Sequence, residues 1–291
     1  MKNLKLWALS CSLLFLFSCS TDENVETENN AKVDLTEFTS RTSTTQNSNT
    51  FFGDPSSSST TVNNLFLEKT GYSLSYNKSR AIANWSAWHL GAGDVGSSNR
   101  SNDFRADTAL PSTFFRAAGT EYSNSGFDRG HLCPSGDRTS GVTRNSETFL
   151  MTNIFPQAPK CNQVTWGNLE DYGRTLVSQG KEIYIYAGTY GTGGVGSNGG
   201  TTNSIFGGKI AVPARVWKVM LVLDSGSGDV GRVTSLTRII AVNMPNSQVI
   251  NSDWRTYRVT TDSLETLLGY DFFAQVATTI QASIEGRTDT L

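Results

Sequence analysis

Apolar and polar positions alternate in several stretches from Leu65 onward, and these stretches predict strands. The segment GYSLSYNKSRAIANWSAWHL alternates aromatic and small residues, which predicts one or two strands with an intervening turn. KEIYIYAGTY predicts a strong strand, and GKIAVPARVWKVMLVLD and SLTRIIAVNMPN predict further ones. A shorter apolar run in ETFLMTNIFPQAPK predicts a buried strand that ends at Pro156 and Pro159.

Two other stretches have helical spacing. In NQVTWGNLEDYGRTLVSQG the apolar residues recur about once per helical turn and Gly180 closes the helix; these residues are Val164, Trp166 or Leu169, Tyr172 and Leu176. SLETLLGYDFFAQVATTIQASI predicts one or two short C-terminal helices. The mixture predicts an α+β fold, with a central, mostly antiparallel sheet flanked by helices.

The glycine-rich segment GTGGVGSNGG contains a formal GxGxxG at Gly191, Gly193 and Gly196. A dinucleotide site requires a helix to begin at this point, and SNGGTTN does not favour one. We therefore interpret the segment as a flexible loop.

The N-terminus predicts export. MKNLK carries two lysines and precedes WALSCSLLFLFS, an apolar run that fits a signal-peptide core but is short for a membrane-spanning helix. Leu16-Phe17-Ser18-Cys19 resembles the lipobox of bacterial lipoproteins, which makes Cys19 a candidate lipid anchor. We expect a signal peptide at 1–18, an anchor and acidic disordered tether at 19–60, and one folded domain at 61–291. The expected location is the outer membrane, facing the periplasm or the cell surface.

Length and charge limit the partners of the folded part. The chain has 291 residues, 37% of them hydrophobic, which is enough for one large core. It carries 24 basic and 26 acidic residues. The leader holds two of the basic residues, and Ser20 to Thr50 holds six acidic and two basic ones, so the remainder is neutral overall. A polyanionic partner must therefore be bound by a local cluster of cations.

Cysteine and histidine are scarce. Of four cysteines, Cys11 lies in the leader and Cys19 at the predicted anchor, which leaves Cys133 and Cys161. In an oxidising compartment such a pair favours a disulfide, because further ligands for a zinc site are lacking. The chain has two histidines. We interpret His89 as structural, because it ends an aromatic strand pattern.

The second histidine stands in GFDRGHLCPSG, where Asp128-Arg129-Gly130-His131 puts an acid, a cation and an imidazole side by side. We expect Gly130 to permit a tight turn of the backbone. Asn153 follows 22 residues after His131, and Asn162 opens NQVTWGNLE, which ends in Glu170. Arg174 stands four residues further on, in position to pair with Glu170 on one helix face.

These residue types suit phosphodiester hydrolysis. Histidine is the natural base near neutral pH. A hard divalent cation stabilises the phosphoryl and departing oxygens and accepts an Asn carbonyl oxygen as ligand. Arginines bind phosphate through two hydrogen bonds. On a continuous α-helix, Asn162 and Glu170 lie about 12 Å apart along the axis and about 80° apart around it. Either the helix starts after Asn162, or Glu170 holds a metal-bound water; we expect the second.

DRGH followed by TNIFPQAPKCNQVTWGNLE resembles the DNA/RNA non-specific endonucleases of the ββα-metal (His-Me finger) class. The resemblance extends from about Tyr72 to Phe273 and includes WSAW, FRAD, MPN and GYDFF. It implies a sugar-non-specific endonuclease that cuts DNA and RNA through backbone contacts and leaves 5′-phosphate and 3′-hydroxyl ends. It also implies Mg²⁺ as cofactor, with Mn²⁺ as a substitute.

The same resemblance implies individual roles. His131 is the general base, Asn162 the direct metal ligand, and Glu170 holds metal-bound waters. Arg129, Arg174 and an upstream arginine contact phosphate; Arg100 fits the upstream spacing best and Arg105 is the second choice. Asn153 lies near the site, and Asp128 orients its neighbours.

A site assembled in this way also implies that Cys133 and Cys161 approach each other and form a disulfide. Two alternative functions are a lipid-anchored binding protein with a degenerate nuclease fold and a metal phosphodiesterase of small substrates. Monomer or dimer, DNA or RNA preference, and biological role stay open.

Overall fold

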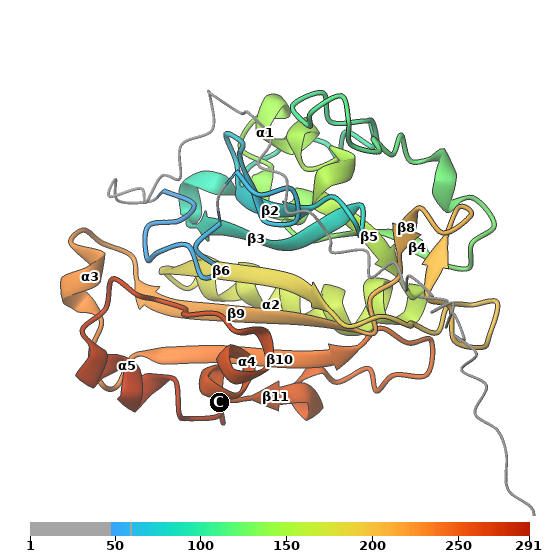
Figure 1. Cartoon of the computed structure of the whole chain (residues 1–291). Helices are drawn as coiled ribbons and strands as arrows, with labels where there is room; N and C mark the ends of the chain where they lie inside the picture. The colour runs from blue at the N-terminus through green and yellow to red at the C-terminus, as the bar shows by residue number, and fades with distance from the viewer. Residues whose placement is uncertain (1–47, 59) are drawn as a thin grey trace, which may run out of the picture. The chain divides into compact units, whose positions relative to one another are not determined.

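The computed structural model describes residues 48–58 and 60–291, and its centre is a seven-stranded sheet. The strand order is β1-β2-β3-β6-β9-β10-β11, and every neighbouring pair is antiparallel (Figure 1). The sheet strands are β1 Leu65–Glu68, β2 Ser73–Asn77, β3 Ile82–Leu90, β6 Lys181–Tyr190, β9 Arg215–Asp224, β10 Arg238–Pro245 and β11 Arg258–Val259. The predicted α+β class with an antiparallel sheet is confirmed.

The α-helices are α1 Val142–Glu147, α2 Gly167–Ser178, α3 Asp229–Arg232, α4 Thr261–Leu268 and α5 Thr278–Ile284. Short 3₁₀ turns are η1 Ala92–Asp94, η2 Thr120–Tyr122, η3 Ser135–Arg138, η4 Met151–Asn153 and η6 Trp254–Tyr257, and η5 Cys161–Trp166 is π-helical. Two small ladders lie outside the main sheet: β4 Asp128–His131 with β5 Ile154–Gln157, and β7 Ser204–Ile205 with β8 Ile210–Ala211. No helix begins in the glycine-rich segment before β7, which agrees with its interpretation as a loop.

The main sheet is buried on both faces, so its strands are apolar at nearly every position. In β6, Ile183 and Ile185 point into the core that α2 covers, whereas Tyr184 and Tyr186 point into the core that α4 and α5 cover. The helices accordingly lie on opposite faces of the sheet (Figure 1). The sheet thus separates two hydrophobic cores, and the DRGH segment belongs to the α2 side.

The DRGH motif forms strand β4, although we expected its glycine to permit a tight turn. The antiparallel ladder pairs Asp128 with Gln157 and His131 with Ile154. Gly130 is required for a different reason, because a Cβ atom at this position would overlap the Gln157 side chain. The expectation of a turn was therefore wrong, and the missing side chain serves a close approach between strands.

The folded region begins before residue 61, which corrects the expected domain boundary. Phe52 is fully buried and packs edge-on against Tyr184 and Phe273. Residues 48–58 therefore complete the core on the α4 and α5 side. The predicted signal peptide, the Cys19 anchor and most of the tether lie outside the described residues. Within the described residues, no helix has the length and apolar character needed to cross a membrane.

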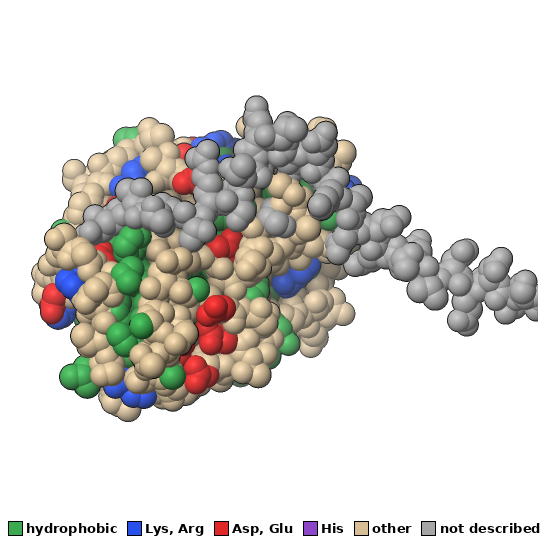
Figure 2. All heavy atoms as spheres, turned by 60° about the vertical axis from the view of Figure 1, so that its left-hand side comes forward, with side chains coloured by type: hydrophobic (Ala, Val, Ile, Leu, Met, Phe, Trp, Pro, Cys, Tyr) green, Lys and Arg blue, Asp and Glu red, His purple; other side chains and the backbone are tan. Residues whose placement is uncertain are grey.

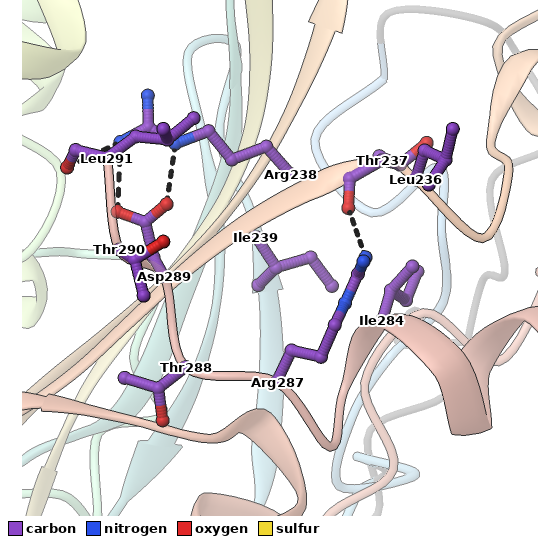
Figure 3. A pocket seen from close by; sticks show the side chains of 10 residues that line it. All are labelled: Leu236, Thr237, Arg238, Ile239, Ile284, Arg287, Thr288, Asp289, Thr290 and Leu291. Atoms are coloured by element: carbon purple, nitrogen blue, oxygen red, sulfur yellow. Dashed lines mark hydrogen bonds and ion pairs between the residues drawn. The ribbon is translucent and has the colours of Figure 1, made fainter.

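The C-terminal segment is fixed to β10 by arginines (Figure 3). Arg238 donates two hydrogen bonds to Asp289, at 2.7 and 2.9 Å, and Arg287 donates to the Thr237 carbonyl oxygen at 3.2 Å. These arginines line a small pocket with Leu236 and Leu291. Both arginines bind other residues of the protein, so we interpret this pocket as a structural contact between β10 and the C-terminal segment.

Candidate active site

His131 ends β4 with its ring enclosed by aromatic side chains. The ring centroid lies 5.6 Å from that of Phe104 and 5.0 Å from that of Phe149. The residue is only 8% exposed, and Nε2 has no hydrogen-bond partner among the described residues. Burial, reinforced by the cations of Arg100 and Arg129, lowers the pKa of His131 to about 3. The imidazole is therefore neutral at physiological pH, with one nitrogen able to accept a proton.

Two arginines rest on the phenylalanines that flank His131. The guanidinium of Arg129 lies 4.1 Å from the Phe104 ring centroid, and that of Arg100 lies 4.7 Å from the Phe149 ring centroid. Arg100 also donates to the Ser135 hydroxyl at 2.7 Å. Cation–π contacts of this kind orient the cations beside the histidine without neutralising them. On the face of the molecule that Figure 2 shows, acidic and basic side chains lie in separate small groups. The arginines beside His131 provide the local cluster of cations that such a protein needs to bind a polyanion.

Asp128 fixes the orientation of the Asn162 amide. Its Oδ2 accepts hydrogen bonds from Asn162 Nδ2 and from Gln163 Nε2, both at 2.8 Å. With Nδ2 occupied, the carbonyl oxygen of Asn162 is the atom left to bind a ligand. Asp128 therefore holds the amide nitrogens of Asn162 and Gln163.

A cavity of about 490 Å³ brings these residues together. It is lined by Arg100, Arg129, Asp128, Asn162 and Gln163, along with Phe104, Tyr122 and other residues of the loop before β4. His131 does not itself line the cavity, but its ring centroid lies 5.6 Å from that of Phe104, which does. Two cations, an oriented amide and a neutral imidazole thus converge from segments far apart in the sequence.

Of the two alternatives that we considered for Asn162 and Glu170, the structure excludes a helix that starts after Asn162. The helix is continuous through Asn162, yet its first turn, η5, is π-helical before α2 begins at Gly167. A π-turn changes the angular spacing of its residues, so the angle expected for a straight α-helix does not apply. Such turns are frequent at functional sites.

Glu170 is held by a buried lysine that the sequence analysis did not single out. Lys218 Nζ lies 3.6 Å from Glu170 Oε1 and 4.1 Å from the centroid of the Trp166 ring. Lys218 is 2% exposed and Glu170 14%. Burial raises the pKa of Glu170 to about 7, while Lys218 opposes that shift. In the sequence, Lys218 stands among apolar residues in the middle of β9. A charged residue at such a position could have indicated a functional role.

Arg174 does not pair directly with Glu170, contrary to expectation. It donates instead to Asp137 at 2.7 Å and to Asp171 at 2.5 Å. Asp137 is buried and also accepts from the Trp88 indole at 3.0 Å. Both carboxylates lie within ion-pair distance of the guanidinium, whereas Glu170 pairs with Lys218. Arg174 therefore ties α2 to η3, near the active site but through protein contacts.

Asn153 is a scaffold residue. Its side chain is fully buried, accepts a hydrogen bond from the Cys133 backbone N–H at 3.0 Å, and donates to the carbonyl oxygens of Cys133 and Thr148. Both polar atoms of its side chain are thus engaged by backbone groups, at Cys133 and Thr148. Asn153 thus fixes the position of the histidine segment and has no group free to touch a substrate.

The two remaining candidates from the sequence lie away from the cavity. Arg105 pairs with Asp103 at 2.7 Å and donates to the Ser146 carbonyl oxygen, which favours Arg100 as the upstream arginine. His89 lies between the carboxylates of Glu182 and Asp94, at 3.1 and 3.5 Å. Its interpretation as a structural histidine agrees with this placement.

The expected disulfide between Cys133 and Cys161 is absent, and both thiols are buried and free. The cause is the register of the β4–β5 ladder. Cys133 follows the end where His131 pairs with Ile154, whereas Cys161 follows the end where Asp128 pairs with Gln157. The antiparallel ladder thus directs the two cysteines to opposite ends, and burial raises the pKa of each thiol to about 12.

Comparison with known proteins identifies the class to which this fold and site belong. The family model described as DNA/RNA non-specific endonuclease matches residues 47–279. The chain therefore belongs to that family and is a hydrolase, an endonuclease that acts non-specifically on nucleic acids. This assignment decides against a degenerate binding protein and against a phosphodiesterase of small esters. The family is typically metal-dependent.

Individual relatives agree with this assignment. A nuclease of Nostoc sp. is 47% identical over 240 residues, which covers 81% of this chain and 84% of the relative. Nuclease C1 of Cunninghamella echinulata var. echinulata is 34% identical over 178 residues, covering 59% and 68% respectively. A chain in the crystal structure of the EndoG/EndoGI complex is 26% identical, with a TM-score of 0.66 and coverage of 81% of this chain and 94% of that one.

The Lys218–Glu170 pair leads to a first prediction. Lys218→Met removes the cation that opposes the rise in the Glu170 pKa, so more of this carboxyl is protonated at pH 7. We expect kcat/KM at pH 7 to fall about 10–100-fold, the usual effect of losing a group that supports a metal site. The measurement is steady-state cleavage over a range of Mg²⁺ concentrations.

The matched control is Lys209→Met, which removes an exposed lysine that stacks on Phe115 and Phe206. Its activity should equal that of the unmodified protein. Full activity of a correctly folded Lys218→Met variant would show that the lysine does not position Glu170.

Proposed function

We propose that this chain is a lipid-anchored, Mg²⁺-dependent nuclease that hydrolyses both DNA and RNA with His131 as the general base, leaving 5′-phosphate and 3′-hydroxyl ends. The observation that carries the proposal is a neutral imidazole, with Nε2 unpartnered among the described residues, beside a cavity lined by Arg100, Arg129 and Asn162. Each element matches one demand of phosphodiester hydrolysis.

The residues present fit a hard divalent cation. The Asn162 carbonyl oxygen is available because Asp128 holds the amide nitrogen, and Glu170 contributes a carboxylate from the same helix. Oxygen donors of this kind suit Mg²⁺ or Mn²⁺. Asn162 would be the direct ligand and Glu170 would act through ordered water. When bound, the cation supplies stabilisation of negative charge on the phosphoryl and departing oxygens.

The chain's own residues divide the remaining work. His131 Nε2 accepts the proton of the attacking water, and the rings of Phe104 and Phe149 hold the imidazole in place. Arg100 and Arg129 bind phosphate oxygens, and the phenylalanines beneath them fix their planes. These contacts address the sugar-phosphate backbone and not the bases, which explains cutting without sequence preference.

A direct experiment tests the proposed activity. The purified protein is incubated with supercoiled plasmid and with single-stranded RNA, in Mg²⁺, in Mn²⁺ and in excess chelator. We expect both substrates to be cut with either metal and to survive in chelator, and the new DNA ends to be ligatable without prior phosphorylation. Cleavage in chelator would contradict the metal requirement, and ends that need a kinase would contradict the proposed polarity.

The membrane location is a separate part of the proposal, supported by Leu16-Phe17-Ser18-Cys19 at the end of the apolar leader. The expected result of Cys19→Ser is release of nuclease activity from the membrane fraction. Protease shaving of intact cells then reports the face on which the domain lies. Retention of the variant in membranes would exclude Cys19 as the anchor.

Arg100 gives a prediction on pH dependence. Its cation lowers the pKa of His131, so Arg100→Met should raise that pKa from about 3 toward the ordinary value. Because neutral histidine is the active form, the acid limb of kcat/KM moves to higher pH. Loss of a charge-assisted phosphate contact also lowers kcat/KM about 10–100-fold. The measurement is a pH profile of plasmid cleavage.

Arg105→Met is the matched control, since Arg105 stands five residues away and pairs with Asp103 outside the cavity. It should leave the acid limb unchanged. An unchanged limb in Arg100→Met as well would contradict the electrostatic coupling between Arg100 and His131.

A further inference from the structure

Three carboxylates gather on the side of the sheet opposite to the active site. Asp262 and Glu265 are three residues apart on α4, so they lie on one helix face, and Glu285 follows directly after α5. One oxygen of each lies within 4.8 Å of the others. Leu264 and Ile284, their neighbours in the sequence, belong to the core on the α4 and α5 side. The cluster is therefore separated from the catalytic cavity by the main sheet.

Glu285 differs from the acids of an ordinary surface cluster because it is buried and lacks a partner for one carboxylate oxygen. Glu285 is only 4% exposed, and its Oε1 has no hydrogen-bond partner among the described residues. The chain is fixed at this point, because the Asp262 backbone N–H donates to the Glu285 carbonyl oxygen at 3.2 Å. A buried carboxylate oxygen without a partner is costly, and an oxygen-binding cation removes that cost.

The charges around Glu285 have a single sign. Burial, together with the carboxylates of Glu265, Asp262 and Asp271, raises the pKa of Glu285 to about 8. Within the described residues, no lysine or arginine forms an ion pair with the three carboxylates of the cluster. Such a group of like charges is stabilised by a proton or by a metal ion.

We propose that Asp262, Glu265 and Glu285 form a structural Ca²⁺ site that joins α4 to the end of α5. Ca²⁺ binds oxygens at 2.3–2.6 Å, so ligands on opposite sides of one ion are at most about 5 Å apart, and the observed spacing satisfies this limit. Mg²⁺ is the weaker candidate because it dehydrates reluctantly and demands near-octahedral geometry, and the set lacks the nitrogen and sulfur donors that transition metals favour.

Gly286 lets the backbone after Glu285 approach the Asp262 carboxylate closely. A Cβ atom on Gly286 would lie 3.3 Å from Asp262 Oδ2, which is tighter than ordinary contact, so a larger residue would crowd this carboxylate. Glu265 keeps one oxygen engaged, because its Oε1 accepts from the Phe272 backbone N–H at 2.6 Å. Its second oxygen is available to a cation. A bound ion would thus stabilise the helices that cover one face of the sheet and leave the catalytic residues untouched.

The experiment measures thermal unfolding and calorimetric Ca²⁺ binding of the full-length protein after chelator treatment and dialysis. Asn162→Ala serves as the reference background, because it removes the proposed catalytic metal ligand. We expect one Ca²⁺ per chain and an unfolding midpoint that rises about 5–10 °C at Ca²⁺ a hundredfold above Kd. The rise should persist in Asn162→Ala, which separates this site from the proposed catalytic one.

Glu285→Gln and Asp262→Asn should each weaken Ca²⁺ binding at least about tenfold, by analogy with the loss of metal-supporting groups. Neither should lower the midpoint of the metal-free protein, since each replaces a repelling carboxylate by a neutral amide. Glu68→Gln, at an exposed position of β1, is the control and should bind Ca²⁺ normally. No Ca²⁺ response in the unmodified protein, or an equal response in Glu285→Gln and Asp262→Asn, would overturn the proposal.

Discussion

Replacing His131 by alanine is expected to lower kcat for DNA and RNA cleavage about 10²–10⁴-fold, the range that a positioned general base contributes. The ring nitrogen of His131 is neutral because burial and two arginines lower its pKa to about 3. The chain has only one other histidine. That residue, His89, is held between Glu182 and Asp94 and cannot replace it. The measurement is the initial rate of plasmid nicking at saturating Mg²⁺.

His89→Ala is the matched control for this variant. It leaves two buried carboxylates without their imidazole partner, so we expect lower stability, by about 1–3 kcal/mol, with kcat retained at a temperature where the protein is folded. His131→Ala should show the opposite behaviour, with cooperative unfolding retained and activity lost. If His131→Ala kept more than a tenth of the activity, another group would have to be the base.

Replacing Asn162 by alanine is expected to lower kcat at least about 100-fold and to abolish the dependence on Mg²⁺ below millimolar concentrations. The reason is that the amide oxygen of Asn162 is the proposed direct ligand, oriented through its hydrogen bond to Asp128. Cleavage rates measured across a Mg²⁺ titration test both parts of this prediction.

Two further substitutions sharpen the result. Asn162→Asp should not restore activity, because it places a second carboxylate where Asp128 Oδ2 now accepts an N–H. Gln163→Ala removes the neighbouring amide that donates to the same oxygen, but Gln163 is exposed and its loss should cost less than about tenfold. Equal losses in Gln163→Ala and Asn162→Ala would indicate that both residues only support Asp128.

The elements of the sheet could be predicted because their patterns are local. The alternation in KEIYIYAGTY corresponds to β6, and the turn within GYSLSYNKSRAIANWSAWHL separates β2 from β3. Strand β4 was missed because Asp128 and Gly130 disfavour strands by intrinsic propensity, while pairing with β5 overrides that preference. The start of the fold was misplaced because one deeply buried aromatic residue, Phe52, stands in a polar context.

The candidate site could be predicted as a set of residue types, but not as a set of contacts. DRGH and NQVTWGNLE already contain the imidazole, one of the two cations and the amide. The sequence did not show which arginine lines the cavity or which acid pairs with Arg174. Both depend on the conformation of loops, which local sequence patterns do not determine. Lys218 could not be assigned to the site from the sequence either. Its strand is buried on both faces, so the apolar pattern does not show whether the lysine points toward α2 or away from it.

The sequence by itself determined the class of fold, the family and a set of candidate catalytic residues, because motif composition and the period of apolar residues are properties of short segments. Only the tertiary structure decided that Cys133 and Cys161 stay apart, that Asn153 serves as scaffold, and that the acids of α4 and α5 meet. These outcomes depend on strand register and on long-range packing. Both are set by the free energy of the whole folded chain, and a single segment does not contain them.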